Sequence, residues 1–285
     1  MIFSRLRTYA SFVRFSHSVF ALPFALTGAL LASRTHAVDG RQIFWIVAAM
    51  VCARSAAMGF NRLVDAAFDA RNPRTAGREL PRGTLSHREA TLFVAIASIA
   101  FIVCASQLSP LCLALSPVAL AIVFWYSLAK RFTWSTQLFL GLAMAVAPVG
   151  GWLAAGGRGG VEPWLLALAI GLWVGGFDVL YACQDLAIDQ AQGLKSIPVR
   201  FGIPRSLTIS RLMHVGAVLS LASLALIVPL GWVYLAGVAA VATLLVYEQS
   251  LVSPHDLSRV KQAFDLNGYV GILYFVVTAI SLYVA

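Results

Sequence analysis

The sequence predicts an all-α membrane protein that forms a single domain over residues 1–285. Hydrophobic residues make up 60% of the chain and charged residues only 12%, and the mean hydropathy is +0.82. Soluble domains carry roughly 25% charged residues. The charges are also segregated, because stretches such as 90–129 and 212–247 contain none. A membrane-spanning helix needs about 20 apolar residues, so each charge-free stretch accommodates one or two spans. No segment between them is long enough to build a separate core.

Nine transmembrane helices can be drawn in order, and polar or helix-breaking residues separate them. Arg34 and Arg41 bound the connection after the first helix, and Ser109-Pro110 divides the run that holds the third and fourth. Lys130-Arg131 ends the fourth helix. The first five expected helices lie at about 15–34, 43–62, 89–108, 110–129 and 134–155.

The C-terminal half supplies the other four expected helices. A glycine-rich turn at 156–160 precedes the sixth, and its glycines do not follow a phosphate-loop pattern. Pro229-Leu230-Gly231 breaks the last long apolar run. These helices are expected at about 163–182, 206–229, 231–250 and 264–285.

The basic residues predict the orientation in the membrane. Of the 21 Lys and Arg residues, only Arg34, Arg41 and Arg158 fall on one side, Arg54 lies within a span, and the rest fall on the other side. Cytoplasmic loops are enriched in Lys and Arg, so we expect the crowded side to face the cytoplasm and the protein to lie in the cell inner (cytoplasmic) membrane. Topology and anionic lipid headgroups account for the net charge of +9, which argues against nucleic acid as a partner.

The first cluster of candidate site residues lies at the cytoplasmic end of the second expected span. On a helix, Asn61, Asp65 and Asp69 fall within about 80° of one another, so one face presents an amide and two carboxylates. Arg54 lies on nearly the same line, closer to the middle of the membrane. An unpaired carboxylate in an apolar helix costs up to a few kcal/mol, so its presence implies a use.

The second cluster lies at the end of the sixth expected span. Asp178, Tyr181, Asp185 and Asp189 fall within about 80° on one helical face. A single carboxylate at a helix end is equally well explained as a solvated loop residue or a structural ion pair. Two matching acidic stripes, with an amide and a tyrosine added, favour a functional site.

The residue types in these stripes are those that bind Mg²⁺ and phosphate. Carboxylate and carbonyl oxygens one helical turn apart suit a hard cation that keeps several waters, namely Mg²⁺. A diphosphate would bridge the two stripes through the metal. The Arg and Lys residues beside the carboxylates fit this interpretation, because a trianionic leaving group needs more positive charge than Mg²⁺ alone supplies.

The order and spacing of these residues resemble the UbiA superfamily of intramembrane aromatic prenyltransferases. Both signatures of the superfamily, N-x-x-x-D-x-x-x-D and D-x-x-Y-x-x-x-D-x-x-x-D, are complete in this chain. Segments 13–15, 126–131 and 193–198 are similar to further family landmarks, so the resemblance runs nearly end to end. Segments 53–62 and 71–81 resemble the 4-hydroxybenzoate polyprenyltransferases and their menaquinone-pathway relatives that act on a dihydroxynaphthoate.

The resemblance implies nine helices around a central cavity, Mg²⁺ as cofactor, a polyprenyl diphosphate donor and an aromatic acid acceptor. It assigns phosphate contacts to Arg14, Lys130 and Lys195, and it places Asp178 and Tyr181 near the reacting carbon. Ionisation of the allylic C–O bond would be followed by attack of the ring. The residues that it assigns to the metal and diphosphate shell are Asn61, Asp65, Asp69, Asp185 and Asp189.

Two questions remain open at this point, the role of Arg54 and the choice between an enzyme and a transporter. Arg54 lies ~10 Å deeper in the membrane than Asn61, where it could bind the acceptor's carboxylate, help hold the diphosphate or form a structural pair with Asp178. The competing function is a secondary transporter, in which intramembrane carboxylates and helix breaks are also expected. The acidic stripes lie at one face of the membrane beside basic loops rather than at its middle, and this favours the enzyme.

Overall fold

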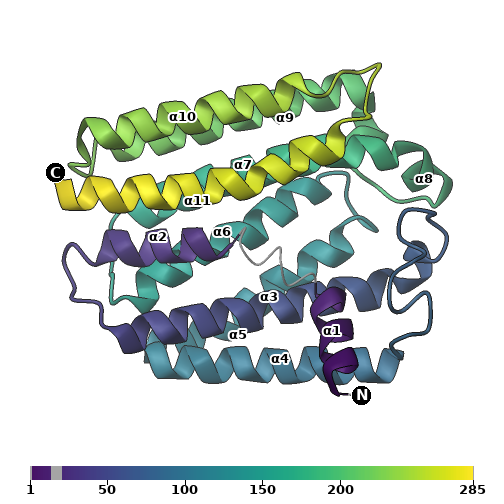
Figure 1. The fold of residues 1–285 in the computed structure, drawn as a ribbon, viewed down its shortest axis with the longest axis horizontal. Coiled ribbons are helices and arrows are strands. Elements are labelled where there is room, and N and C mark those ends of the chain that lie inside the picture. The colour runs from purple at the N-terminus through teal and green to yellow at the C-terminus, as the bar shows by residue number, and fades with distance from the viewer. Residues whose placement is uncertain (1, 14–20, 285) are drawn as a thin grey trace.

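A computed structural model describes residues 2–13 and 21–284, and within these residues the chain forms a bundle of long helices (Figure 1). Eight of the described helices are long and apolar enough to cross a membrane. The prediction of an all-α membrane fold is therefore confirmed. These helices are α3 (Gly40–Asp69), α4 (His87–Leu108), α5 (Pro110–Ala129), α6 (Thr136–Ala154), α7 (Glu162–Ala182) with its continuation, α9 (Ile197–Leu224), α10 (Gly231–Ser250) and α11 (Val260–Val284).

Two shorter helices, α1 (Ile2–Phe12) and α2 (Leu22–Ala32), precede the eight spans. The first predicted span, 15–34, falls partly on residues 14–20, which lie outside the described part of the chain, as does the candidate phosphate ligand Arg14. The 11 residues of α2 cover ~16 Å, about half of the hydrocarbon core. A total of nine spans therefore stays a prediction.

Polar residues at the helix starts explain where several spans begin. Asp39 accepts a hydrogen bond from the backbone N–H of Gln42 at 2.7 Å, while the Gln42 side chain accepts one from the Asp39 backbone at 3.1 Å. Ser86 and Glu89 form the same reciprocal cap at the start of α4. Each cap satisfies N–H groups that a helix start leaves unpaired and contributes about 1 kcal/mol.

The structure corrects the predicted helix boundaries at two places. The sixth predicted span was expected to carry the second acidic motif on one continuous helix, but α7 ends at Ala182 and a 3₁₀ turn, η2 (Cys183–Asp185), leads into α8 (Leu186–Ala191). The seventh was expected from residue 206, but α9 already begins at Ile197. It is kinked at Gly202, where φ is +74°. Pro204 explains the kink, because proline cannot donate to the helical ladder.

The closest helix contact brings α2 and α6 together through glycines. A Cβ atom on Gly151 would lie 1.9 Å from the carbonyl oxygen of Ala25, and one on Gly28 would lie 2.1 Å from that of Pro148. These backbones touch because neither glycine carries a side chain. Such close approach is how helices pack in lipid, where dispersion contacts replace the hydrophobic driving force.

Buried hydrogen bonds join α7, α10 and α11. The indole N–H of Trp173 donates to the side-chain oxygen of Asn267 at 2.7 Å, and the hydroxyls of Tyr234 and Tyr274 lie 2.9 Å apart. All four residues are buried. These four polar side chains, which lipid or core would otherwise leave unpaired, thus have partners.

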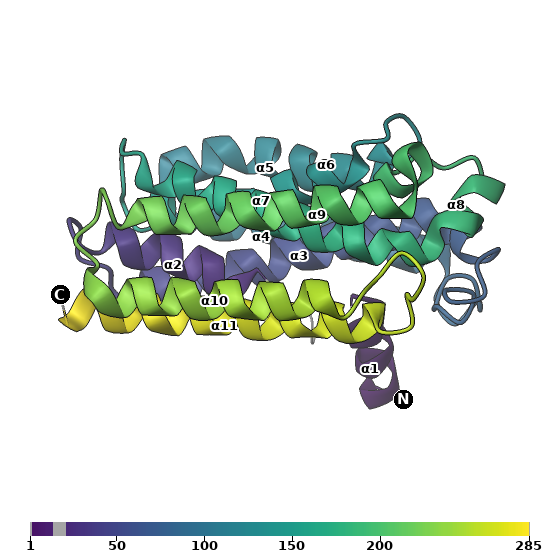
Figure 2. The ribbon, with the colours of Figure 1, turned by 90° about the horizontal axis from the view of Figure 1, so that it is seen from above.

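The polar connections gather at one end of the bundle. Figures 1 and 2 show the loop after α3, helix α8 and the loop before α11 at this end, and the C-terminus at the other. The sequence analysis predicted that most basic loops lie on one side of the membrane, and this arrangement agrees with it. It places both acidic motifs at the same end of the molecule.

Candidate active site

A cavity of about 350 Å³ lies at the polar end, between α3, α5, α6, α7, α8 and α11 and the loop at 70–86. The two acidic motifs are far apart in sequence, and the fold brings them to opposite walls of this one cavity. Every predicted site residue in the described part of the chain lines it. These residues are Arg54, Asn61, Asp65, Asp69, Lys130, Asp178, Tyr181, Asp185, Asp189 and Lys195.

Asp65, on α3, lies at the centre of a network of charges. Its Oδ2 accepts hydrogen bonds from Lys130 Nζ at 2.6 Å and from the Asn61 amide at 3.3 Å, and its Oδ1 accepts one from Arg131 at 3.1 Å. Only 4% of Asp65 is exposed. A carboxylate this buried needs several charged or polar partners, and here both of its oxygens have them.

Asp69 and Asp185 are each paired with an arginine from the loop at 70–86. Both oxygens of Asp69 accept from Arg78 at 2.7 Å. Arg74 donates to Asp185 through two nitrogens at 2.6 and 3.2 Å, and it donates to the Tyr181 hydroxyl at 3.1 Å. The guanidinium of Arg74 also lies 5.4 Å from the centre of the Tyr181 ring. The loop therefore closes over the cavity by binding both acidic motifs.

Arg74 lies outside the membrane-spanning helices, and its pKa reflects these contacts. Burial acts to lower the pKa of its guanidinium, but the carboxylate of Asp185 and the hydroxyl of Tyr181 outweigh burial, and the pKa is raised above its ordinary value. Arg74 is therefore a permanent positive charge at the mouth of the cavity.

Asp178 and Asp189 also line the cavity, but their side chains form no hydrogen bond or ion pair with residues 2–13 or 21–284. Within the same residues, no three acidic, histidine or cysteine side chains stand close enough to share one metal ion. The donor set is nevertheless the one that Mg²⁺ prefers, because carboxylate and amide oxygens dominate it. The residues fit the metal by chemistry, and the carboxylates of Asp65, Asp69 and Asp185 are paired with protein cations.

Lys195 and Gln192 tie the second motif to the rest of the cavity wall. The Lys195 ammonium donates to the carbonyl oxygen of Phe132 at 3.1 Å rather than to a motif carboxylate. The Gln192 amide donates to the carbonyl of Phe68, at the end of the first motif, at 3.3 Å. Lys195 thus lies on the cavity wall, as predicted, with its charge directed at the turn after α5.

Arg54 lines the deeper part of the cavity on α3. Its Nε atom is buried and has no hydrogen-bond partner. The structural pair with Asp178 that the sequence left open is not formed, since no ion pair joins these two described residues. Arg54 therefore lines the cavity as a cation without an ion pair to any residue that the structure describes.

Sequence reasoning did not assign Arg74, Arg78 or Arg131 to the site. The first two served as evidence for orientation and as part of segment 71–81, which resembles the 4-hydroxybenzoate polyprenyltransferases. They received no role in the site, because the loop that carries them is a series of turns without periodicity. Arg131 lies beside the predicted Lys130 and shares its partner Asp65. The high density of arginine in this loop, beside two acidic stripes, was the signal that could have assigned Arg74 and Arg78 to the site.

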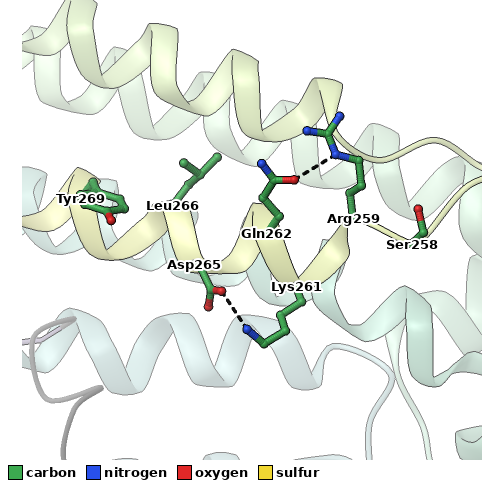
Figure 3. Close-up of a pocket in the computed structure, with 7 residues that line it drawn as sticks. All are labelled: Ser258, Arg259, Lys261, Gln262, Asp265, Leu266 and Tyr269. Carbon is green, nitrogen blue, oxygen red and sulfur yellow. Dashed lines mark hydrogen bonds and ion pairs between the residues drawn. The ribbon is translucent and has the colours of Figure 1, made fainter.

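A second hollow, of about 440 Å³, lies at the start of α11 (Figure 3). Figure 3 shows Arg259 bound to Gln262 and Lys261 paired with Asp265, each at 3.0 Å. None of the predicted site residues lines this hollow. Its lining consists of Ser258, Arg259, Lys261, Gln262, Asp265, Leu266 and Tyr269.

The fold and the cavity together define a class of membrane-embedded transferase, in which carboxylates and cations at the polar end of a helical bundle face an apolar interior. Comparison with known proteins identifies the family. The model of the UbiA prenyltransferase family matches residues 21–276. The chain belongs to this family, and the prediction of a prenyltransferase is confirmed.

Relatives and solved structures agree with this assignment. The 4-hydroxybenzoate octaprenyltransferases of Citrobacter koseri and Salmonella newport are each 32% identical over 250 residues, which cover 86% of this chain and 86% of theirs. A UbiA homolog from Aeropyrum pernix K1 has a TM-score of 0.85 and 34% identity, with 94% of this chain and 98% of that chain covered.

A more distant structure shares the fold. A UbiA homolog from Archaeoglobus fulgidus, solved bound to DMAPP and Mg²⁺, has a TM-score of 0.73 at 17% identity over 95% of this chain and 99% of that chain. The family assignment removes the basis for the transporter alternative.

Proposed function

We propose that this chain, as one transmembrane domain over residues 1–285, transfers a polyprenyl group from polyprenyl diphosphate to the ring of 4-hydroxybenzoate or a dihydroxynaphthoate in respiratory quinone biosynthesis. The observation that carries the proposal is the meeting of two acidic motifs and a basic loop at one cavity. The relatives named 4-hydroxybenzoate octaprenyltransferase support an aromatic acid as acceptor.

The donor set of the cavity supports Mg²⁺ as cofactor. Asn61, Asp65, Asp69, Asp185 and Asp189 would hold the ion, and they supply the oxygen ligands that Mg²⁺ prefers. When bound, Mg²⁺ neutralises charge that develops on the leaving diphosphate. The related fold solved with DMAPP and Mg²⁺ supports this assignment.

The chain's own side chains divide the remaining work. Lys130 lies beside the carboxylate of Asp65, and Lys195 lines the same cavity, so both can bind diphosphate oxygens as the allylic C–O bond breaks. Arg14 is assigned the same role by family resemblance alone. Asp178 and Tyr181 lie on the wall of α7, where they can orient the aromatic ring before it loses its proton.

Apolar residues complete the cavity. Leu140, Met144, Val174, Phe177 and Phe264 line it beside the polar groups. Such a wall keeps water from the allylic cation and directs the polyprenyl tail toward lipid. Because the polar end of the bundle carries the basic loops, we place this end at the cytoplasmic face of the inner membrane.

The proposal is tested with purified protein in detergent, geranyl diphosphate and Mg²⁺. We expect a prenylated aromatic product, detected by mass spectrometry, with 4-hydroxybenzoate or with 1,4-dihydroxy-2-naphthoate. Asp185→Asn should nearly abolish it, and Asp265→Asn should not, because Asp265 lines the separate hollow of Figure 3, its side chain is 55% exposed and it pairs with Lys261. Hydrolysis of the diphosphate without any prenylated acceptor would contradict the proposal.

A further inference from the structure

Three carboxylates of the site, those of Asp65, Asp69 and Asp185, are already paired with protein cations. Asp69 is held by Arg78 with both oxygens at 2.7 Å, and Asp185 is held by Arg74 at 2.6 and 3.2 Å. The side chains of Asp69 and Asp185 are only 10% and 16% exposed. Charge-assisted pairs with this geometry are among the strongest hydrogen bonds in proteins. The oxygens through which Asp69 and Asp185 would bind a metal ion are therefore engaged by arginine.

A divalent ion that enters by itself must displace these guanidinium groups. Displacement would leave Arg74 and Arg78 without a partner in a partly buried cavity, which is unfavourable. A diphosphate changes this balance, because its oxygens match the guanidinium fork as well as a carboxylate does. The arginine can then exchange one anion for another, and the freed carboxylate can bind the metal.

Arg131 differs from the two loop arginines in how it is fixed. It donates to the carbonyl oxygens of Ser127 at 2.9 Å and of Val64 at 2.6 Å, and it lies 5.1 Å from the centre of the Phe68 ring. These groups remain whatever enters the cavity. The side-chain partners of Arg74 and Arg78, by contrast, are the motif side chains themselves. Exchange is therefore a property of the loop at 70–86.

We propose that Arg74 and Arg78 compete with the divalent metal for Asp185 and Asp69 and transfer to the diphosphate when it binds, so that metal and diphosphate load together. Metal alone binds weakly, and diphosphate raises the affinity for metal. By thermodynamic reciprocity, metal raises the affinity for diphosphate by the same factor. This coupling prevents the site from filling with metal before the donor arrives. The inference rests on the proposed function, because it takes polyprenyl diphosphate as the ligand.

The test measures Mn²⁺ binding to the full chain in detergent by isothermal titration calorimetry, with free Mn²⁺ set by a metal buffer. Titrations are run with and without farnesyl S-thiolodiphosphate on wild type, Arg74→Gln and Arg78→Gln. Arg82→Gln is the matched control, because Arg82 lies exposed on the same loop. We expect wild type to bind Mn²⁺ weakly alone and at least tenfold more tightly with the analogue.

Each loop variant should bind Mn²⁺ alone about tenfold more tightly than wild type, because one charge-assisted competitor is removed. The increase in Mn²⁺ affinity that the analogue produces should be smaller in the same variants. Arg82→Gln should behave as wild type. A wild type that binds Mn²⁺ equally well with and without analogue would overturn the coupling and leave the proposed function standing. So would loop variants with unchanged or weaker Mn²⁺ affinity.

Absence of Mn²⁺ binding even with analogue would refute the proposed function together with the inference. The wild-type comparison tests the coupling without any substitution. Arg74→Lys provides a further variant, in which the charge is kept and the two-nitrogen contact with Asp185 is lost. Its Mn²⁺ affinity should lie between those of wild type and Arg74→Gln.

Discussion

Replacing Arg54 with lysine should weaken binding of the aromatic acceptor while leaving use of the prenyl donor unchanged. Arg54 lies seven residues before Asn61 on α3, and therefore ~10 Å deeper than Asn61 and the metal-binding layer that we propose. Its Nε is buried without a partner, and it lines the same cavity as Asp178. A carboxylate on the acceptor would satisfy the guanidinium with two parallel hydrogen bonds, which an ammonium cannot reproduce.

The size of the effect follows from the bond that is lost. A hydrogen bond to a charged group contributes about 1.5–3 kcal/mol, and each 1.4 kcal/mol corresponds to about a factor of ten. Arg54→Lys keeps the charge and loses one of the two bonds. The acceptor's KM should therefore rise roughly ten- to hundredfold, with kcat little changed, because the interaction is the same in the bound substrate and the transition state.

The assay compares initial rates on 4-hydroxybenzoate and on its neutral amide. Wild type should prefer the acid strongly, and Arg54→Lys should lose most of this preference because its contact with the carboxylate is weakened. The donor's KM serves as the internal control. If acceptor and donor kinetics are both unchanged while the melting temperature in detergent falls, Arg54 is structural and the reasoning is wrong.

Three further predictions follow from the site and the packing. Asp65→Asn should nearly abolish turnover while the protein stays folded and inserted, because it removes one charge from a proposed metal ligand at constant size. Full activity in excess chelator would exclude the metal. A reporter fused after Ala285 should report the outer face of the membrane, and a cytoplasmic signal would remove the nine-span topology. Gly151→Ala should destabilise the protein by about 1–3 kcal/mol, because its Cβ would meet the Ala25 carbonyl, whereas Gly150→Ala, with nothing within 4 Å, should leave the melting temperature unchanged.

The spans were predictable because a helix that crosses lipid needs a run of about 20 apolar residues with few charges. The expected helices at 89–108 and 110–129 agree closely with α4 and α5, since charge-free runs and a Ser-Pro break are local signals. The 3₁₀ turn at Cys183–Asp185 was not predictable, because it contains neither glycine nor proline and α7 keeps its apolar character up to it. Gly202 and Pro204 did carry the signal for the kink of α9, but the start of the helix before the kink was missed.

The sequence predicted many of the residues that line the cavity, but it did not predict how they pair. Asn61 and Asp65 were found because a helix converts spacing into direction, and carboxylates are expensive in apolar helices. The partners of the other carboxylates come from a loop without a repeat, so nothing local says that Arg74 reaches Asp185, 111 residues away. Such pairings are set by the tertiary fold alone.

Helix α8 has a consequence for how variants of this protein can be selected. It is six residues long, and none of its residues is buried. A shift of α8, with Asp189 on it, therefore uncovers no core and leaves the melting temperature almost unchanged. A screen that ranks variants by heat resistance does not detect changes in this segment. Stabilised variants therefore have to be sequenced over α8 before they are used to study turnover.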